Sequence, residues 1–338
     1  MSNDTPLSIL STYEQSLVHQ RQTQVAQVKT KLKSGKYSLE KTTCFCGSIE
    51  EIEIITEERM GIPHRLVICR ECALIRANPR LTAEGYKQFY NDDYRILHSA
   101  SSANREVPLR DNWDELASAW VRQVENGKVL LKAYEEQGQT FPKTVLDFGC
   151  YYGGMMQAFH DRGVKCYGIE VDHTAREIAE ERGFDISSSL DDLITRGVKV
   201  DFIIMQDIIE HLTDLRGDLE KIDKLLEKGG ILYIWTPGLF GSTVTTNNLF
   251  QFAHTFQFCG HTLDYVMGAL GFEPIYLDEM CTSFWRRPVS YSSQNFYVPR
   301  KPTEWVEFSL DQLDKKKNRR FPPCKNICKF TRKERYEN

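Results

Sequence analysis

Apolar and polar residues alternate in blocks along residues 144–277, and each block has the length of a strand or a helix. Residues 144–148 form a short continuous apolar run, which is typical of a parallel strand covered on both faces. Further strands are predicted at residues 165–171, 184–186, 199–205, 231–238 and 272–277, and helices at residues 155–162, 173–182, 214–228 and 261–271. Such an alternation predicts an α/β fold with a doubly wound sheet that carries helices on both faces.

Other patterns flank this region. Residues 7–33 place apolar side chains at helical spacing and predict an amphipathic helix that packs on the body of the protein or on a second subunit of a homodimer. Residues 50–68 alternate in polarity around Gly61, as a β-hairpin would. We therefore divide the chain into an N-terminal helix (1–40), a cysteine-rich module (41–98), the α/β domain (105–300) and a basic tail (301–338).

Composition narrows the class of protein. The chain has 338 residues, 41% of them apolar, and a net charge of −4. This length allows one domain of about 200 residues and a smaller module. The chain shows no apolar run of the ~18 residues that a membrane helix needs, and its first residues do not resemble a signal peptide, so we expect a soluble cytoplasmic protein. In a reducing compartment its ten cysteines stay thiols that are available to metals.

The first predicted strand ends in a glycine-rich turn between two acidic residues. Asp147 precedes Gly149 and Gly153, and Glu170 lies at the end of the second strand, where an acid can accept hydrogen bonds from both ribose hydroxyls. The spacing differs from the G-x-G-x-x-G of dinucleotide sites. These features predict a nucleoside-binding βαβ unit of another kind.

The turn resembles the first motif of class I S-adenosylmethionine (SAM) methyltransferases. The resemblance implies a Rossmann-like, seven-stranded sheet. A small zinc ribbon in front of this sheet is predicted from the cysteines and the hairpin of residues 41–98. The family usually has glycine in place of Tyr151, so either the loop keeps its shape around a bulky side chain or the cofactor sits differently. The resemblance implies the following cofactor-binding residues: Asp147, Gly149, Tyr151 and Gly153 at the methionine moiety, Glu170 and Val171 at the ribose, Ser189 and Leu190 at the adenine, and Gln206 and Asp207 below the sulfonium.

Residues 206–212 resemble the D-x-x-E-H element of small-molecule methyltransferases. A sugar hydroxyl is a weak nucleophile near neutral pH, so a general base is expected, and an imidazole suits this role. His211, oriented by Glu210, is our candidate; in the alternative, His211 caps the next helix and Glu210 shapes the pocket. Residues 238–260 correspond to a substrate lid, in which His254, Phe256 and Phe258 either line an acceptor pocket or pack in an ordinary loop.

Cys44, Cys46, Cys69 and Cys72 form two pairs, as tetrahedral Zn²⁺ requires. The first pair reads C-x-C where zinc turns usually read C-x-x-C, so either Cys44 binds by distorting its turn or His64 takes its place. We predict a structural zinc ion; the alternative is four buried thiols.

Residues 73–95, after the last of these cysteines, are similar to the corresponding segment of bacterial methyltransferases that act on sugars and glycans. This similarity implies methyl transfer to a small-molecule or glycan acceptor, with a sugar hydroxyl in polysaccharide or nucleotide-sugar biosynthesis as the first candidate. The alternatives are a zinc-ribbon methyltransferase of ribosomal RNA bases, against which the net charge of −4 argues, and a non-catalytic SAM-binding or adaptor protein. The basic segment 315–335 is either a solvated end or a contact for an anionic substrate or membrane surface, and it contains a further cysteine pair, Cys324 and Cys328.

Overall fold

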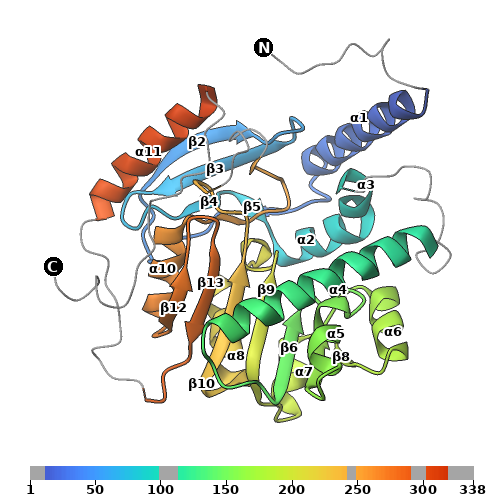
Figure 1. Ribbon diagram of the computed structural model, residues 1–338. Helices are drawn as coiled ribbons and strands as arrows, with labels where there is room; N and C mark the ends of the chain where they lie inside the picture. Colours follow the sequence, from blue (N-terminus) through green and yellow to red (C-terminus); the bar gives the residue numbers. More distant parts are fainter. Residues whose placement is uncertain (1–11, 99–112, 242–248, 291–301, 319–338) are drawn as a thin grey trace.

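The computed structural model describes residues 12–98, 113–241, 249–290 and 302–318 (Figure 1). Its centre is a seven-stranded sheet in the order β12-β13-β10-β9-β6-β7-β8. Neighbouring strands from β10 to β8 run parallel, whereas β13 is antiparallel to both β10 and β12. The strands are β6 (Thr144–Phe148), β7 (Lys165–Ile169), β8 (Asp185–Ser187), β9 (Val200–Gln206), β10 (Leu226–Trp235), β12 (Glu273–Leu277) and β13 (Thr282–Arg286). The predicted α/β sheet is confirmed, and β13 is the strand for which we predicted no residue range.

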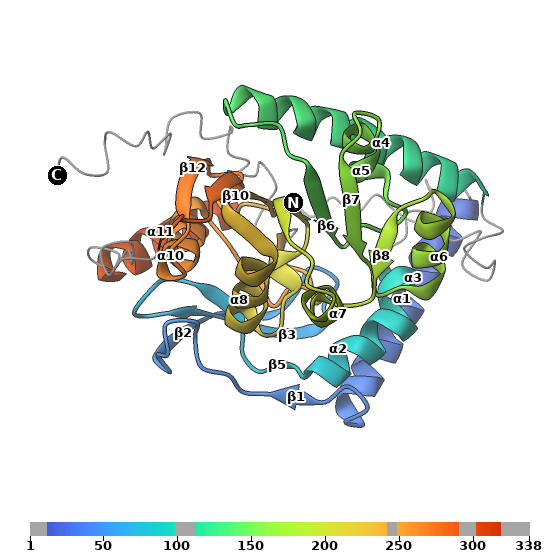
Figure 2. The ribbon, with the colours of Figure 1, turned by 90° about the horizontal axis from the view of Figure 1, so that it is seen from below.

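Helices cover both faces of this sheet, because side chains of each strand alternate between two cores. On β9, Phe202 and Ile204 pack with α4, α5 and α6, whereas Ile203 and Met205 pack with α7, α8 and α10. Figure 2 shows α4 and α5 on one side of the strands and α7 and α8 on the other. The helices are α4 (Trp113–Glu136), α5 (Gly154–His160), α6 (His173–Glu181), α7 (Leu190–Thr195), α8 (Leu215–Leu225) and α10 (Gly260–Ala269). The double winding predicted from the sequence is therefore confirmed.

A second sheet, of order β11-β4-β3-β2, belongs to the cysteine-rich module. The hairpin predicted around Gly61 is confirmed, since β2 and β3 pair in antiparallel fashion. The outermost strand, β11, comes from a much later part of the chain and pairs Phe256 with Arg76 of β4. The strands are β2 (Glu51–Glu57), β3 (Pro63–Cys69), β4 (Ile75–Ala77) and β11 (Phe256–Gln257). The module and the α/β domain thus share a sheet.

The N-terminal helix is confirmed as α1 (Thr12–Lys33), and it leads to the short helices that precede the α/β domain. Asp93, buried at 1% exposure, joins these parts by accepting hydrogen bonds from Lys31 at 2.7 Å and from Tyr37 and Gln24. The remaining elements here are β1 (Leu39–Glu40), which pairs with β5 (Arg80–Leu81), then α2 (Ala83–Phe89), the π-helix η2 (Tyr90–Tyr94) and α3 (Arg95–His98).

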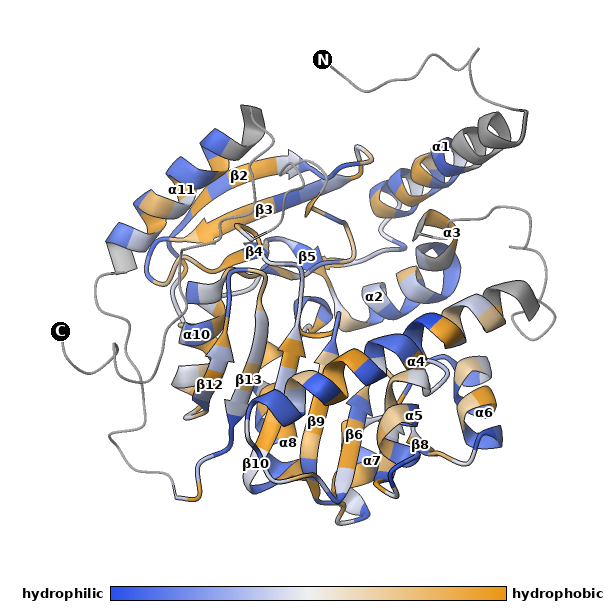
Figure 3. Ribbon diagram, in the orientation of Figure 1, coloured by the Kyte–Doolittle hydropathy of each residue, from blue (hydrophilic) through white to orange (hydrophobic). Residues whose placement is uncertain are grey.

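The segment predicted as a basic tail (301–338) begins with a packed helix, α11 (Pro302–Asn318). Val306 and Leu313 of this helix are buried against Leu66 and Ile68 of β3. Figure 3 shows hydrophobic residues on α11 and on the two strands beside it. The described start of the segment 301–338 is therefore packed, because apolar positions recur there at helical spacing. Of the basic segment 315–335, only residues 315–318 fall within the described ranges, so the two readings of that segment stay predictions. Residues 319–338, with Cys324 and Cys328, lie outside the described residues.

Within the described ranges, no helix combines the length and the apolar character needed to cross a membrane.

Candidate functional site

Two carboxylates lie at the carboxyl ends of the adjacent parallel strands β6 and β7. Asp147 pairs with Gly168 in the strand register, which places it next to Glu170 just past the end of β7. Asp147 is 3% exposed, and its Oδ2 atom has no hydrogen-bond partner. Burial, and secondly the charge of Glu170, raise the pKa of Asp147 to about 7. Burial also raises the pKa of Glu170. These groups present negative charge, and one orphaned acceptor, to a ligand at this edge of the sheet.

The turn after β6 keeps the conformation that glycine favours even at Tyr151. Gly149 has φ +80°, and a Cβ atom there would lie 2.2 Å from Cδ1 of Ile208. Tyr151 has φ +50°, and its N–H donates to Glu170 Oε2 at 2.9 Å. Its ring packs on Tyr152 with centroids 3.7 Å apart. Tyr151 thus adopts the left-handed backbone that glycine favours, and the bond to Glu170 holds it there.

The residues expected near the ribose and the adenine differ in their surroundings. Val171 is 77% exposed, directly after Glu170. The Ser189 side chain caps α7 by accepting from the Asp192 N–H at 3.2 Å, and Leu190 is buried in the core. The Leu190 side chain therefore has a packing role, while Ser189 lies just beyond β8 at the same edge of the sheet as Asp147.

The end of β9 carries a second acidic pair. Gln206 ends the strand, and Asp207 follows with φ +56°, its N–H donating to the Trp235 carbonyl at 2.9 Å. Asp207 is accessible to water, yet the surrounding protein desolvates it enough to raise its pKa to about 6. Glu210 is 2% exposed, and burial, followed by the charge of Asp207, raises its pKa to about 8.

His211 ends the short 3₁₀ helix η4 (Ile209–His211) and is fixed by two groups from other parts of the chain. Its Nδ1 lies 2.7 Å from the Tyr90 hydroxyl and 3.1 Å from the Ala253 carbonyl oxygen. Its ring meets that of His254 at 88°, with centroids 4.8 Å apart. Burial lowers the pKa of His211 to about 4, so the imidazole is neutral at pH 7. The N-cap of α8 is Asp214, so His211 does not cap that helix.

Sequence reasoning missed the aromatic wall on the module side of His211. Tyr90 and Tyr94 extend from the end of α2 into η2, and their rings lie 4.7 Å apart. Burial raises the pKa of Tyr94, and the charges of Asp207 and Glu210 raise it further, which places its hydroxyl near both acids. The spacing of Tyr86, Tyr90 and Tyr94, each four residues apart, is the signal that could have shown one aromatic helical face.

Of the predicted lid residues, His254 reaches the site, but Phe256 and Phe258 do not line a pocket there. Both rings are buried in the core between the second sheet and the α8–α10 face. They pack because β11 joins the second sheet as an edge strand, which fixes residues 256–258 as structural ones.

The four cysteines converge on one point. All four Sγ atoms lie within 4.8 Å of one another, with Cys44–Cys72 and Cys46–Cys69 at 3.5 Å. A tetrahedral Zn²⁺ with Zn–S bonds of about 2.3 Å requires sulfur–sulfur distances of about 3.8 Å, so the donor set fits zinc. His64 is outside this group, with its ring beside Phe252, whereas Cys44 belongs to it despite its C-x-C spacing.

Glu210, His211 and His254 form a second group with donor atoms within 4.8 Å of one another. Such a set could hold a metal ion or exchange a proton, since neutral imidazole and carboxylate serve in both roles.

The comparisons with known proteins agree with this architecture. Residues 120–277 match the family model described as a methyltransferase domain. The chain is similar to a ubiquinone biosynthesis O-methyltransferase of Chelativorans sp. (strain BNC1), with 26% identity over 99 residues, which cover 27% of this chain and 39% of that protein. The chain thus spans well under half the length of this curated relative.

Two solved structures are also similar to this chain. One is a SAM-bound amino pentose methyltransferase of Micromonospora echinaspora, involved in calicheamicin biosynthesis, with 16% identity, coverage of 52% of this chain and 96% of that chain, and a TM-score of 0.41. The other is a plantazolicin methyltransferase in complex with S-adenosylhomocysteine, with 12% identity, coverage of 68% of this chain and 87% of that chain, and a TM-score of 0.41. The match of residues 120–277 shows a methyltransferase domain in this part of the chain, as predicted.

Proposed function

We propose that this protein transfers the methyl group of SAM to a hydroxyl group of a small-molecule or glycan acceptor. The observation that carries this proposal is the position of His211, a neutral imidazole fixed at the carboxyl end of β9 beside Asp207 and Glu210. In an α/β sheet this edge is where ligands bind.

The residues at the ends of β6 and β7 fit the cofactor. Asp147 has a buried acceptor without a partner, and Gly149 lets the turn pass directly beside Ile208, where a Cβ atom would lie 2.2 Å from Cδ1. We assign Asp147, Gly149, Tyr151 and Gly153 to the methionine end and Glu170 to the ribose. Asp207 and Gln206 then border the reacting centre. When bound, SAM supplies a methyl group already activated by a sulfonium, so the protein has to align the acceptor, exclude water and take up one proton.

His211 is suited to take up that proton. If Nδ1 carries its hydrogen, it donates to the Ala253 carbonyl, and Nε2 keeps a free lone pair. The Tyr90 oxygen, at 2.7 Å, further restricts the ring. Because the imidazole is neutral at pH 7, it is in the form that accepts a proton. Glu210 lies within 4.8 Å of it, and above its pKa of about 8 the carboxylate would stabilise the imidazolium that forms.

A sugar hydroxyl in bacterial polysaccharide or nucleotide-sugar biosynthesis is the first acceptor class that we propose. Support comes from the similarity of residues 73–95 to sugar and glycan methyltransferases, and from the contact of this segment with His211 through Tyr90. The net charge of −4 favours this acceptor over ribosomal RNA. The set of buried acids and imidazoles at one sheet edge favours an enzyme over a SAM-binding adaptor.

We also propose a structural zinc ion held by Cys44, Cys46, Cys69 and Cys72. Three of these cysteines are buried in the same core as α8 and α10, so the ion would anchor the module to the α/β domain. The eight cysteines in the described ranges are free thiols, which suits a reducing compartment, and we place the protein in the cytoplasm.

The experiment is a transfer assay with methyl-labelled SAM and three acceptor pools: a bacterial glycan and nucleotide-sugar extract, bulk RNA, and buffer. Mass spectrometry should find the label in the first pool. Label in RNA would favour the ribosomal alternative, and label in neither pool would favour the adaptor.

A further inference from the structure

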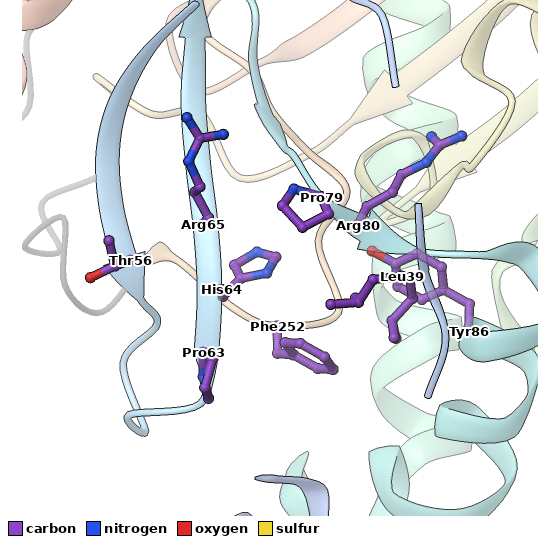
Figure 4. A pocket seen from close by; sticks show the side chains of 10 residues that line it. Leu39, Thr56, Pro63, His64, Arg65, Pro79, Arg80, Tyr86 and Phe252 are labelled. Carbon is purple, nitrogen blue, oxygen red and sulfur yellow. The ribbon is translucent and has the colours of Figure 1, made fainter. Parts of the chain in front are cut away.

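A small cavity lies between the cysteine-rich module and the segment that carries His254. Its volume is about 140 Å³, and its walls come from β1, β2, β3, β5 and α2, together with Pro79 and Phe252. Figure 4 shows the side chains of His64, Pro79, Leu39 and Phe252 converging on one space. An engineered apolar cavity of about 150 Å³ in another protein holds benzene, so this space has the size of one six-membered ring.

One buried polar atom of the cavity wall has no hydrogen-bond partner. His64 is 5% exposed, and its Nε2 has no hydrogen-bond partner. Its other ring nitrogen forms a hydrogen bond with the backbone of His254. This bond raises the pKa of His64, so the ring N–H donates it to the carbonyl oxygen. Burial is the larger effect and lowers the pKa of His64 to about 4. A neutral imidazole that donates through one nitrogen keeps a lone pair on the other. His64 Nε2 is therefore a buried, unpaired acceptor to which a ligand can donate one hydrogen bond.

Charged ligands do not fit this wall. The two arginines that border the cavity are already paired: Arg65 with Glu51 and Glu53, both at 2.8 Å, and Arg80 with Glu40 at 3.0 Å. In Figure 4 their guanidinium groups point away from the space between His64 and Leu39. An anion would have to break these ion pairs, and a fully hydroxylated sugar would leave several hydroxyls without partners.

The cavity adjoins the proposed proton acceptor along two routes. Tyr86 lines the cavity, and its ring lies 6.3 Å from that of Tyr90, whose hydroxyl is 2.7 Å from His211. On the other side, His64 bonds to the backbone of His254, whose ring lies 4.8 Å from that of His211. Tyr86 and Tyr90 on one side, and His254 on the other, thus connect the cavity wall to His211.

We propose that this cavity binds an uncharged, largely apolar six-membered ring of the methyl acceptor, with one hydroxyl or amino group that donates to His64 Nε2. This inference rests on the proposed function, because it identifies the ring as part of the acceptor. Two kinds of ring have this chemistry: an aromatic ring such as a phenol, and a sugar ring that has lost most of its hydroxyls.

The test measures binding without turnover, so that it stands apart from the transfer assay. Phenol, tetrahydropyran-4-ol, toluene and glucose are titrated into the full-length protein and followed by saturation-transfer NMR. Phenol or tetrahydropyran-4-ol should bind. Tighter binding of phenol would indicate an aromatic ring in the acceptor, and tighter binding of tetrahydropyran-4-ol would indicate a sugar ring that has lost most of its hydroxyls. Glucose binding as tight as either, or no binding of either, would overturn the proposal.

Variants locate the site. His64→Phe should lower the affinity for phenol about tenfold relative to the affinity for toluene, because it removes the buried acceptor and keeps an aromatic wall. His160→Phe, on an exposed histidine of α5, should leave that ratio unchanged. Leu39→Trp, at a half-exposed cavity residue, should reduce the binding of both ligands and serves as a second test if His64→Phe does not fold. An unchanged ratio in His64→Phe together with unchanged binding in Leu39→Trp would contradict the site.

The link to the acceptor has its own readout. Phenol or tetrahydropyran-4-ol, whichever binds more tightly, should inhibit methyl transfer competitively with the acceptor and not with SAM, and His64→Phe should lose most of any inhibition by phenol. Binding without such inhibition would contradict the assignment to the acceptor.

Discussion

Replacing Asp147 with asparagine should stabilise the unliganded protein and weaken its binding of SAM. Burial is the main cause that raises the pKa of Asp147 from 3.8 to about 7, with a contribution from Glu170. This change corresponds to about 4 kcal/mol of free energy against the ionised form in the folded protein. Ionisation of this group therefore opposes folding.

Because folding raises the pKa of Asp147, its ionisation destabilises the folded protein only above a certain pH. Below about pH 4 the carboxyl is neutral in both the folded and the unfolded state, so it carries no ionisation cost. The cost grows between pH 4 and 7 and is complete above pH 7. The gain from Asp147→Asn should thus be larger at pH 8 than at pH 5 by about 2–3 kcal/mol. The cost of burying the unpaired amide is common to both pH values and cancels in this difference.

Urea denaturation of the wild type and of Asp147→Asn at pH 5 and pH 8, without SAM, measures this difference. Asp161→Asn, on an exposed aspartate, is the matched control and should show no such dependence. Calorimetry should show weaker SAM binding by Asp147→Asn at pH 8. A destabilisation that is equal at the two pH values would refute the reasoning, because it would mean that Asp147 folds with an ordinary pKa.

Two further predictions concern the zinc ion and the ribose contact. Metal analysis should find about one zinc per chain. The double variant Cys69→Ser/Cys72→Ser should lose this zinc and unfold in the module, whereas Cys166→Ser should keep it. A second bound metal would assign Glu210, His211 and His254 to metal binding instead of proton uptake. Glu170→Gln should weaken SAM binding by about 1–3 kcal/mol, since it removes a carboxylate acceptor. Glu180→Gln, at an exposed position of α6, should leave SAM binding unchanged. If calorimetry finds equal SAM affinities for the wild type and Glu170→Gln, Glu170 is not part of the site.

The α/β domain could be predicted because its signals are local. The apolar run of β6, the glycine turn and the acid after β7 are each encoded within a few residues, and the structure places them as expected. Strand β13 escaped prediction because Thr282–Arg286 lacks a flanking helix that would mark it as part of the alternation.

The surroundings of His211 could not be predicted in the same way. Its position after β9 followed from the sequence, but its partners Tyr90 and Ala253 lie 121 and 42 residues away along the chain. Likewise, the strand pairing of Phe256 with Arg76 joins two distant segments, and it decides that Phe256 packs in the core and does not line a pocket. Such long-range contacts leave no periodic signal in either segment.

Transfer of a labelled methyl group by the wild type and by His211→Ala tests the central claim most directly. With the acceptor pool that the wild type methylates, His211→Ala should reduce turnover by roughly 10²–10⁴-fold, the usual contribution of a general base, while SAM affinity stays unchanged. The wild-type rate should fall toward low pH as His211, with a pKa of about 4, becomes protonated, and this limb should be absent in the variant. A variant that methylates within about threefold of the wild type would contradict the account and leave His254 as the remaining imidazole at the site.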